Sequence, residues 1–330
     1  MPRKRNNARG QDPRWEGKGI HFRGFGLYYP EKLVMNEPGL TDDSGNEIDA
    51  SVLGRVQVKS RHVSNEKETV ARMAAEAGGQ AVQNAGISPS DLDLIILSNW
   101  TTPPYTPEYG PEVASLLGTP RTLAYDISGA CTGFVHGVQS AAAYLHSIQG
   151  PGYALVTCSE QFSRRARPGS KGELVCGDAA GAAVLEKRDD GGTGLIDSTL
   201  RSDGDRASVV SVPTDTGWVR SQRDLADHAV AGIVEACSEL LDRSGLRMSD
   251  IDWVVPHPGT DVVHNRVRGA LGVPETKLVL NFQVRGNTTS ASIPIVLAEK
   301  WDAGLFRPGD LVLSPAIGAG WYSGALLYRI

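Results

Sequence analysis

The sequence predicts an α/β protein of two similar halves, because helical patterns alternate with apolar strands and three segments recur in one order. Residues 85–95 (AGISPSDLDLI) resemble residues 244–254 (SGLRMSDIDWV), and each follows an Ala-rich helical stretch and runs into an apolar strand. The two further pairs are 150–156 with 307–313, and 181–185 with 324–328. One match could arise by chance, whereas three in the same order indicate an internal duplication.

In each half we expect helix, buried strand, strand, helix, strand, loop, strand. The segments that define this order are helical patterns at 69–85, 133–145 and 224–244 and apolar runs at 92–97, 121–125 and 251–255. Continuous apolar strands imply sheets that helices cover on both faces. We therefore expect α/β/α/β/α layers with a pseudo-two-fold axis. The halves would be residues 19–188 and 189–330, after a disordered basic tail at 1–18.

Composition indicates an ordinary globular protein. The 330 residues are 40% hydrophobic and 22% charged, with a net charge of −5, so no basic surplus points to nucleic acid. No apolar run is long enough to span a membrane, and the basic N-terminus leads into no signal-like segment. The four cysteines have no CxxC spacing, which argues against a zinc site or a disulfide framework and favours the reducing cytoplasm.

Cys131 lies in the stretch Asp126–Phe134 (DISGACTGF), between an apolar run and a helical pattern. A strand, a turn of small residues and a helix start would place its thiol at a helix N-terminus. There the helix dipole and the free N–H groups favour the thiolate. The alternative is a buried structural cysteine, which is the commoner fate of a single cysteine.

Two further side chains are expected to face Cys131. His257 follows the apolar run 251–255, and Asn287 lies in the segment 285–290 (RGNTTS), which in the second half occupies the turn that Cys131 occupies in the first. Taken singly, the histidine could be structural and the asparagine a turn or cap residue. A pseudo-two-fold axis, however, would bring the corresponding turns together, so a thiol, an imidazole and an amide should converge on one cleft.

With these residues the sequence resembles the ketoacyl-acyl-carrier-protein synthase III group of the thiolase-fold condensing enzymes. The likeness runs from about residue 20 to residue 330. The segments that carry it are 126–134, 177–185 (GDAAGAAVL), 255–257 (VPH), 286–288 (GNT) and 318–324 (GAGWYSG). The resemblance implies the thiolase fold in its five-layer form, a homodimer, and substrates that arrive as coenzyme A or acyl-carrier-protein thioesters. It implies no metal and no cofactor.

The resemblance also implies a catalytic triad of Cys131, His257 and Asn287. The thiolate would take an acyl group from a thioester, and the backbone N–H groups of Cys131 and Ala319 would form the oxyanion hole. A malonyl-type extender would then lose carbon dioxide while His257 and Asn287 hold the enolate oxygen. The carbanion formed would attack the acyl-cysteine and make a carbon–carbon bond.

Other positions are predicted to bind substrate. Arg55 lies near a family position that contacts coenzyme A, although a solvated surface arginine is an equal alternative. Lys171 lies in a loop where the family often has a basic residue near the nucleotide. Thr106 falls where the family sends a residue across the dimer interface to the partner's acyl pocket. Thr260 replaces the asparagine that follows the family's catalytic histidine.

Departures from the family pattern lie on the acceptor side. Where the family commonly reads Gln-Ala-Asn-x-Arg after the histidine, this chain has residues 258–262 (PGTDV), so Val262 replaces a phosphate-binding arginine. We therefore expect acyl-cysteine chemistry with a changed donor, acceptor or carrier, as in specialised polyketide or secondary metabolism. The alternatives are an acyltransferase that passes the acyl group to an alcohol or amine, and a catalytically silent partner subunit. The intact triad argues against the silent subunit.

Overall fold

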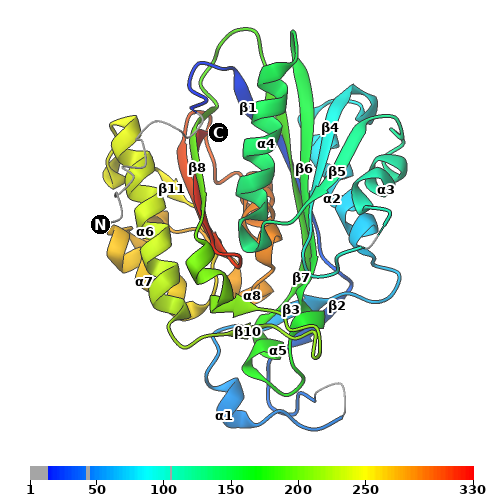
Figure 1. Cartoon of the computed structure of the whole chain (residues 1–330), viewed down its shortest axis with the longest axis vertical. Helices are drawn as coiled ribbons and strands as arrows, with labels where there is room; N and C mark the ends of the chain where they lie inside the picture. The colour runs from blue at the N-terminus through cyan, green and yellow to red at the C-terminus, as the bar shows by residue number, and fades with distance from the viewer. Residues whose placement is uncertain (1–13, 42–44, 105) are drawn as a thin grey trace.

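The structure, a computed structural model, describes residues 14–41, 45–104 and 106–330, and these form two main sheets with helices between and outside them (Figure 1). The first sheet has the strand order β1-β7-β6-β4-β5 and the second the order β8-β13-β12-β11. The strands of the first sheet are β1 (Ile20–Tyr28), β4 (Leu92–Ser98), β5 (Leu123–Ile127), β6 (Gly152–Gln161) and β7 (Asp178–Lys187). Those of the second are β8 (Leu195–Ser202), β11 (Trp253–Val254), β12 (Leu311–Gly318) and β13 (Tyr322–Arg329).

The two sheets repeat one topology, as the sequence predicted. β4 runs parallel to β5 and β6, while β7 runs antiparallel to β6 and β1. In the second sheet β11 is parallel to β12, and β13 is antiparallel to β12 and β8. The counterpart of β5 is reduced to one parallel bridge between Val254 and Leu278. The antiparallel strands β1 and β8 were missed, because neither belongs to a segment that repeats visibly.

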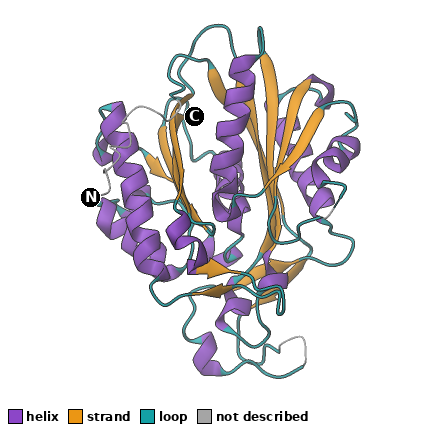
Figure 2. Cartoon of the chain, in the orientation of Figure 1, coloured by secondary structure: helices purple, strands orange, loops and turns teal. Residues whose placement is uncertain are grey.

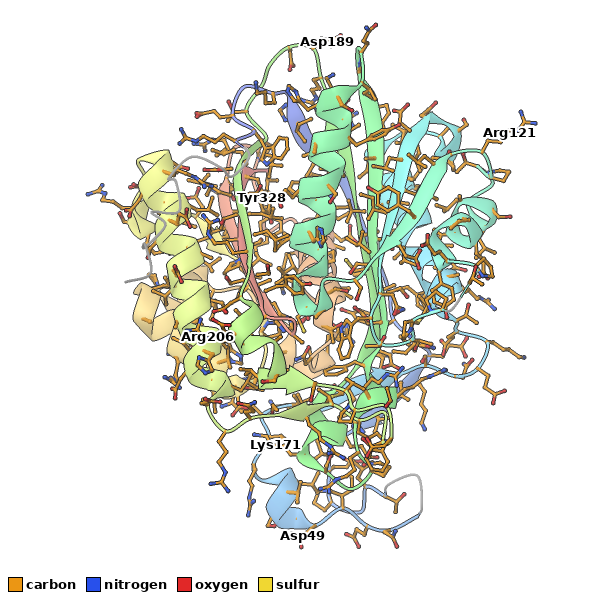
Figure 3. All side chains as sticks on the ribbon, in the orientation of Figure 1. Asp49, Arg121, Lys171, Asp189, Arg206 and Tyr328 are labelled. Carbon is orange, nitrogen blue, oxygen red and sulfur yellow. The ribbon has the colours of Figure 1, made fainter. Side chains whose placement is uncertain are left out.

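Helices form the other three layers (Figure 2). α2 (Val70–Ala85) and α3 (Tyr109–Leu116) cover the outer face of the first sheet, and α6 (Leu225–Ser244) and α7 (Asp261–Leu271) cover that of the second. α4 (Gly133–Ser147) and α9 (Ser292–Asp302) lie between the sheets. The largest apolar cluster joins residues of both middle helices to both sheets and includes Tyr328, which Figure 3 labels in this central region. The predicted α/β/α/β/α layering is confirmed.

Element ends follow local chemistry. Thr69, predicted inside a helix, is the N-cap of α2, and its Oγ1 accepts a hydrogen bond from the N–H of Arg72 at 3.3 Å. β5 begins at Leu123 and runs through Ile127, so it carries the chain closer to Cys131 than predicted. β11 is shorter than the predicted strand, although the N–H of Val255 still reaches the carbonyl of Leu313 at 2.9 Å.

The prediction of a disordered tail at 1–18 is wrong for residues 14–18, and its residues 1–13 lie outside the described residues. Trp15 is 4% exposed, and its indole N–H donates to Ser198 Oγ at 2.8 Å. Arg14 lies 3.8 Å from the Asp197 carboxylate. A single tryptophan buries enough apolar surface to hold a polar segment on the second sheet, which composition alone does not reveal.

Short elements gather at one end of the two sheets, the lower end in Figure 1. They are the pairs β2 (Lys32–Met35) with β3 (Ser60–Val63) and β9 (Val210–Ser211) with β10 (Arg220–Ser221), and the helices α1 (Ala50–Leu53), α5 (Lys171–Val175) and α8 (Phe282–Arg285). In the described part of the chain, no helix has both the length and the apolar character that a membrane crossing needs.

Candidate active site

Cys131 lies in a tight turn between β5 and α4. The turn is a single 3-10 element, Ala130–Thr132, after which α4 begins at Gly133. Ala130 has a φ of +46°, a left-handed value that non-glycine residues seldom adopt. Thr132 steadies the turn, because its Oγ1 donates to the carbonyl of Gly129 at 2.6 Å. Cys131 is thus held at the start of the helix, as the sequence predicted, and most but not all of its surface is buried.

The second half repeats this turn. Thr289 has a φ of +49° and opens the 3-10 element Thr289–Ala291, which leads into α9. Ala130 therefore corresponds to Thr289, and Cys131 corresponds to Ser290. The two turns are in direct contact, because a Cβ on Gly133 would collide with Ser98 Oγ and lie 3.0 Å from Ser290 Cβ. Only glycine at position 133 permits this approach.

His257 lies just beyond β11, where its backbone N–H donates to the carbonyl of Pro315 at 2.8 Å. Its side chain is 3% exposed, and Nδ1 lies 3.3 Å from Ser292 Oγ on α9. Burial lowers the pKa of His257 to about 4. The imidazole is therefore neutral at physiological pH and can exchange a proton or donate a hydrogen bond without carrying a charge.

Asn287 is fixed at both ends of its amide. Its Nδ2 donates to the carbonyl of Gly259 at 2.8 Å, and its Oδ1 accepts from the N–H of Thr289 at 2.8 Å. The backbone adds a strand-like bridge to Cys176, in which the N–H of Asn287 donates to the carbonyl of Val175 at 2.7 Å. Since Nδ2 carries two hydrogens, one remains for a ligand.

Cys131, His257 and Asn287 line one cavity of about 700 Å³. Its walls are largely apolar and aromatic, including Trp100, Phe162, Trp218, Val263, Ile317 and Trp321. Exposed basic residues line its solvent end: Arg167, Lys171 and Arg220. A cavity of this size suits a thioester with a long, flexible arm, with an apolar interior for the acyl group and cations where the arm leaves the protein.

The thiol does not have the lowered pKa that its helix position alone suggested. Burial raises the pKa of Cys131, and the nearby negative charge of Glu160 raises it further. A hydrogen bond with the residue's own backbone N–H acts in the opposite direction but is weaker. Cys131 therefore rests as a thiol, so its reaction requires a group that takes the proton.

The predicted binding residues are only partly gathered at this cavity. Ala319, Thr260 and Lys171 line it. Thr260 also caps α7 by accepting from the N–H of Val263 at 3.4 Å. Lys171, the first residue of α5 and labelled in Figure 3, lies 3.8 Å from Asp261. Arg55 and Thr106 are exposed and are not among the lining residues, so their contact with substrate stays a prediction.

Sequence reasoning missed a buried polar group behind the nucleophile. Glu160, at the end of β6, accepts hydrogen bonds from Ser290 Oγ at 2.5 Å and Thr101 Oγ1 at 2.8 Å. A signal was present, because Glu160 is a charged residue at the end of an otherwise uncharged run, 152–159. A residue-by-residue alignment of the two turns would have shown that Ser290 corresponds to Cys131.

The neutral state of His257 gives a direct test. The NMR signals of its ring should not shift between pH 5.5 and 8, because its lowered pKa leaves the imidazole unprotonated above about pH 4. The His257→Asn variant identifies the signal by its disappearance. In the unfolded chain, all histidines should titrate near their usual value of about 6.5. A titration of His257 near 6.5 in the folded protein would contradict the burial of its ring.

A duplicated thiolase-type fold with a cysteine, a neutral histidine and an asparagine on one cavity defines an acyl-transferring condensing enzyme. The comparisons with known proteins identify the family. Residues 125–204 match the family described as 3-Oxoacyl-[acyl-carrier-protein (ACP)] synthase III, and residues 241–330 match the family of its C-terminal part. The chain belongs to the 3-oxoacyl-[acyl-carrier-protein] synthase III family.

Relatives match over nearly the whole chain. The beta-ketoacyl-[acyl-carrier-protein] synthase III of Allorhizobium ampelinum is 35% identical over 324 residues, which cover 93% of this chain and 98% of the relative. That of Mesorhizobium japonicum is 33% identical with the same coverage. The crystal structure of 3-oxoacyl-[acyl-carrier-protein] synthase III from Aquifex aeolicus has a TM-score of 0.86 and 30% identity, covering 94% of this chain and 100% of that one.

Proposed function

We propose that this protein catalyses a decarboxylative Claisen condensation, in which an acyl group held on Cys131 is joined to a malonyl-type extender. One observation carries the proposal: a thiol, a neutral imidazole and an amide with a free N–H line the same apolar cavity. An acyl acceptor, a proton acceptor and donors for an oxyanion are the three groups that this reaction requires.

In the loading step Cys131 attacks the carbonyl of an acyl thioester. Because burial favours the thiol form, the sulfur must lose its proton as it attacks, and the neutral His257 in the same cavity is the base available. The backbone N–H groups of Cys131 and Ala319 would hold the oxyanion. The neighbouring backbones support this pairing, since a Cβ on Gly318 would lie only 3.0 Å from the nitrogen of Cys131. The leaving thiol then takes the proton, and the acyl-cysteine remains.

In the condensing step the extender loses carbon dioxide and its thioester carbonyl becomes an enolate. The free Nδ2 hydrogen of Asn287 can donate to this oxygen. Ser292 Oγ, 3.3 Å from Nδ1 of His257, can serve both steps. In loading it can accept from Nδ1, which leaves Nε2 free as the base, and in condensation it can donate to Nδ1, which places the ring proton on Nε2, where it can donate as well. Two neutral donors aimed at a developing negative charge lower the barrier to decarboxylation. The carbanion then attacks the acyl-cysteine and releases the Cys131 thiolate.

Delivery as a coenzyme A or acyl-carrier-protein thioester is supported by the basic solvent end of the cavity. Arg167, Lys171 and Arg220 are exposed there and can contact phosphate groups. The relatives are named beta-ketoacyl-[acyl-carrier-protein] synthase III, which is consistent with a carrier protein for at least one substrate.

We propose a role in specialised metabolism because of the acceptor side. Val262, where the family commonly has an arginine, is 48% exposed and offers nothing to a phosphate. Thr260, which replaces the asparagine, uses its hydroxyl oxygen to cap α7 by accepting from the N–H of Val263. The same two positions favour the second candidate, an acyltransferase that uses an alcohol or amine acceptor. Asn287 supports the condensing reaction, because only an enolate needs its donor.

A homodimer is supported by the free edge of the first sheet. β5 is an edge strand, and apolar residues beside this edge are exposed, namely Leu123 at 51% and Leu116 at 54%. An apolar strand edge of this kind is normally covered by a partner. The cytoplasm is supported by the four cysteines, all of which are free thiols.

Intact-protein mass spectrometry tests the proposal. The protein is incubated with a panel of acyl thioesters beside Cys131→Ala, and malonyl thioester, an alcohol or an amine is then added. We expect an acyl adduct on the wild type alone, discharged by malonyl thioester as a ketoacyl product. Discharge only by an alcohol or amine would establish the second candidate. If no donor gives an adduct that depends on Cys131, both the condensing enzyme and the acyltransferase are overturned, and the catalytically silent subunit is the hypothesis that remains.

A further inference from the structure

Glu160 is a buried carboxylate that the proposed reaction does not use. It lies at the end of β6 with no solvent exposure and contacts the repeated turn of the second half through Ser290. Oε1 accepts from Ser290 Oγ at 2.5 Å. Oε2 accepts from Thr101 Oγ1 at 2.8 Å and from the N–H groups of Thr101 and Trp100 at 3.3 Å. Burying an ionisable acid costs free energy that these donors offset only in part, so the group calls for a functional explanation.

These contacts join two loops that shape the active site. Ser290 follows directly on Thr289, whose N–H holds Oδ1 of Asn287, so the position of Ser290 affects the amide that faces the cavity. Trp100 and Thr101 belong to the loop after β4, and Trp100 lines the acyl end of the cavity against Phe162. Glu160 thus fixes the turn that carries Asn287 to the loop that carries the wall of the acyl pocket.

Glu160 also lies close to the nucleophile, because Ser290, which donates to its carboxylate, packs against Gly133, two residues after Cys131. Its negative charge raises the pKa of Cys131 and, on its own strand, that of Cys158. The other groups around its carboxylate are neutral: the hydroxyls of Ser290 and Thr101 and backbone N–H groups. One cation lies behind these groups, since Arg165 donates to the carbonyl of Thr101 at 2.5 Å. The reactivity of the thiol therefore depends on whether Glu160 carries its charge.

We propose that Glu160 is a positioning residue of the condensation, which clamps the Asn287 turn through Ser290 and whose ionisation tunes the reactivity of Cys131. Only the positioning role in this inference rests on the proposed function; the effect of Glu160 on the Cys131 thiol does not. Burial raises the pKa of Glu160 to about 7, so the group changes its charge in the range where the enzyme works. Above that pH the negative charge of Glu160 disfavours the Cys131 thiolate. Below that pH Glu160 is neutral and no longer disfavours it.

Alkylation of Cys131 by iodoacetamide, followed by peptide mass spectrometry from pH 5.5 to 9.5, tests the charge. In the wild type the logarithm of the rate should rise with pH, flatten near pH 7 as Glu160 ionises, and rise again. In Glu160→Gln the break should vanish, and alkylation at pH 8.5 should be about threefold to tenfold faster, since one pKa unit changes the thiolate fraction tenfold. Identical profiles in the two proteins would overturn the inference.

Two further variants separate the clamp from the charge. Ser290→Ala keeps the charge, so the break should stay while kcat for condensation falls at least fivefold with little change in acyl loading. Glu160→Asp shortens the reach by one methylene and should behave in the same way, with the break retained. Equal loss of loading and condensation would reject the clamp, because a general structural defect lowers both. Circular dichroism identifies any variant that does not fold.

The alkylation assay needs no substrate. If the break is present but no acyl thioester loads Cys131, the proposed function fails while the role of Glu160 in tuning the thiol stands. If loading and condensation proceed but the break is absent, the proposed function stands and the role of Glu160 in tuning the thiol fails.

Discussion

Asn287→Ala should form the acyl-Cys131 adduct at close to the normal rate and yet condense it about 10²- to 10³-fold more slowly. The free Nδ2 hydrogen is directed at the enolate oxygen, a charge that exists only during decarboxylation, whereas the loading step uses backbone donors. Mass spectrometry of the adduct measures loading, and release of carbon dioxide from malonyl thioester measures the second step. The split between the two rates is the expected result.

Two controls make this split interpretable. Asn287→Asp keeps Oδ1, which holds the N–H of Thr289, but loses the donor, so it should share the loss in decarboxylation. Asn281→Ala removes an equally buried asparagine that contacts Glu299 at 3.1 Å outside the cavity, and the ratio of the two rates should stay normal. Loading and condensation that fall together in Asn287→Ala would show that the amide is structural. An acyl-enzyme that reacts only with amines or alcohols would remain active in this variant.

Gly318→Ala should abolish most acyl loading, by at least about 10²-fold, because the new methyl group enters the oxyanion hole. Its Cβ would lie 3.0 Å from the nitrogen of Cys131 and from the carbonyl oxygen of Gly129, both of them backbone atoms that cannot rotate away. Overpacking of this kind also costs about 1–3 kcal/mol of stability. The rate of adduct formation and the midpoint of thermal unfolding measure the two effects.

Gly269→Ala is the matched control, since a Cβ there meets nothing within 4 Å in helix α7. Alanine in this last turn of the helix should stabilise the protein by up to about 1 kcal/mol and leave loading unchanged. Normal loading in Gly318→Ala would mean that the backbone of Cys131 can move aside, and the assignment of its N–H to the oxyanion hole would fail.

The fold was predictable because the duplication leaves local copies that survive in the sequence. The segments 85–95 and 244–254 both join an outer helix to a central strand, so matching them fixed the layers and the facing turns. β1 and β8 were not predicted, since an antiparallel edge strand has no repeated neighbour on which to align it. The buried Trp15 was missed for a similar reason, because it is one apolar residue in a polar context.

The positions of site residues that follow a strand end were predictable from the sequence. Their protonation states, which depend on burial, were not. Cys131, His257 and Asn287 were placed by topology, and all three reach the same cavity. The protonation state of the Cys131 thiol was not predicted. The sequence shows the helix N-terminus, but it does not show that Cys131 is buried or that the charge of Glu160 lies nearby. Arg55 was predicted from a family position alone, and the exposed loop after α1 does not bring it to the cavity.

The paired left-handed residues Ala130 and Thr289 have a consequence for how this enzyme could be altered. Each turn leads directly into one of the middle helices, α4 or α9, so the spacing between sulfur and amide depends on how these helices pack, together with the backbone hydrogen bond from Asn287 to Val175 of the first half. Changes of side-chain size in that central layer, far from any substrate, would move one half against the other. The middle helices therefore set the distance between the Cys131 sulfur and the Asn287 amide. Substitutions in these helices can change that distance without changing a reacting group.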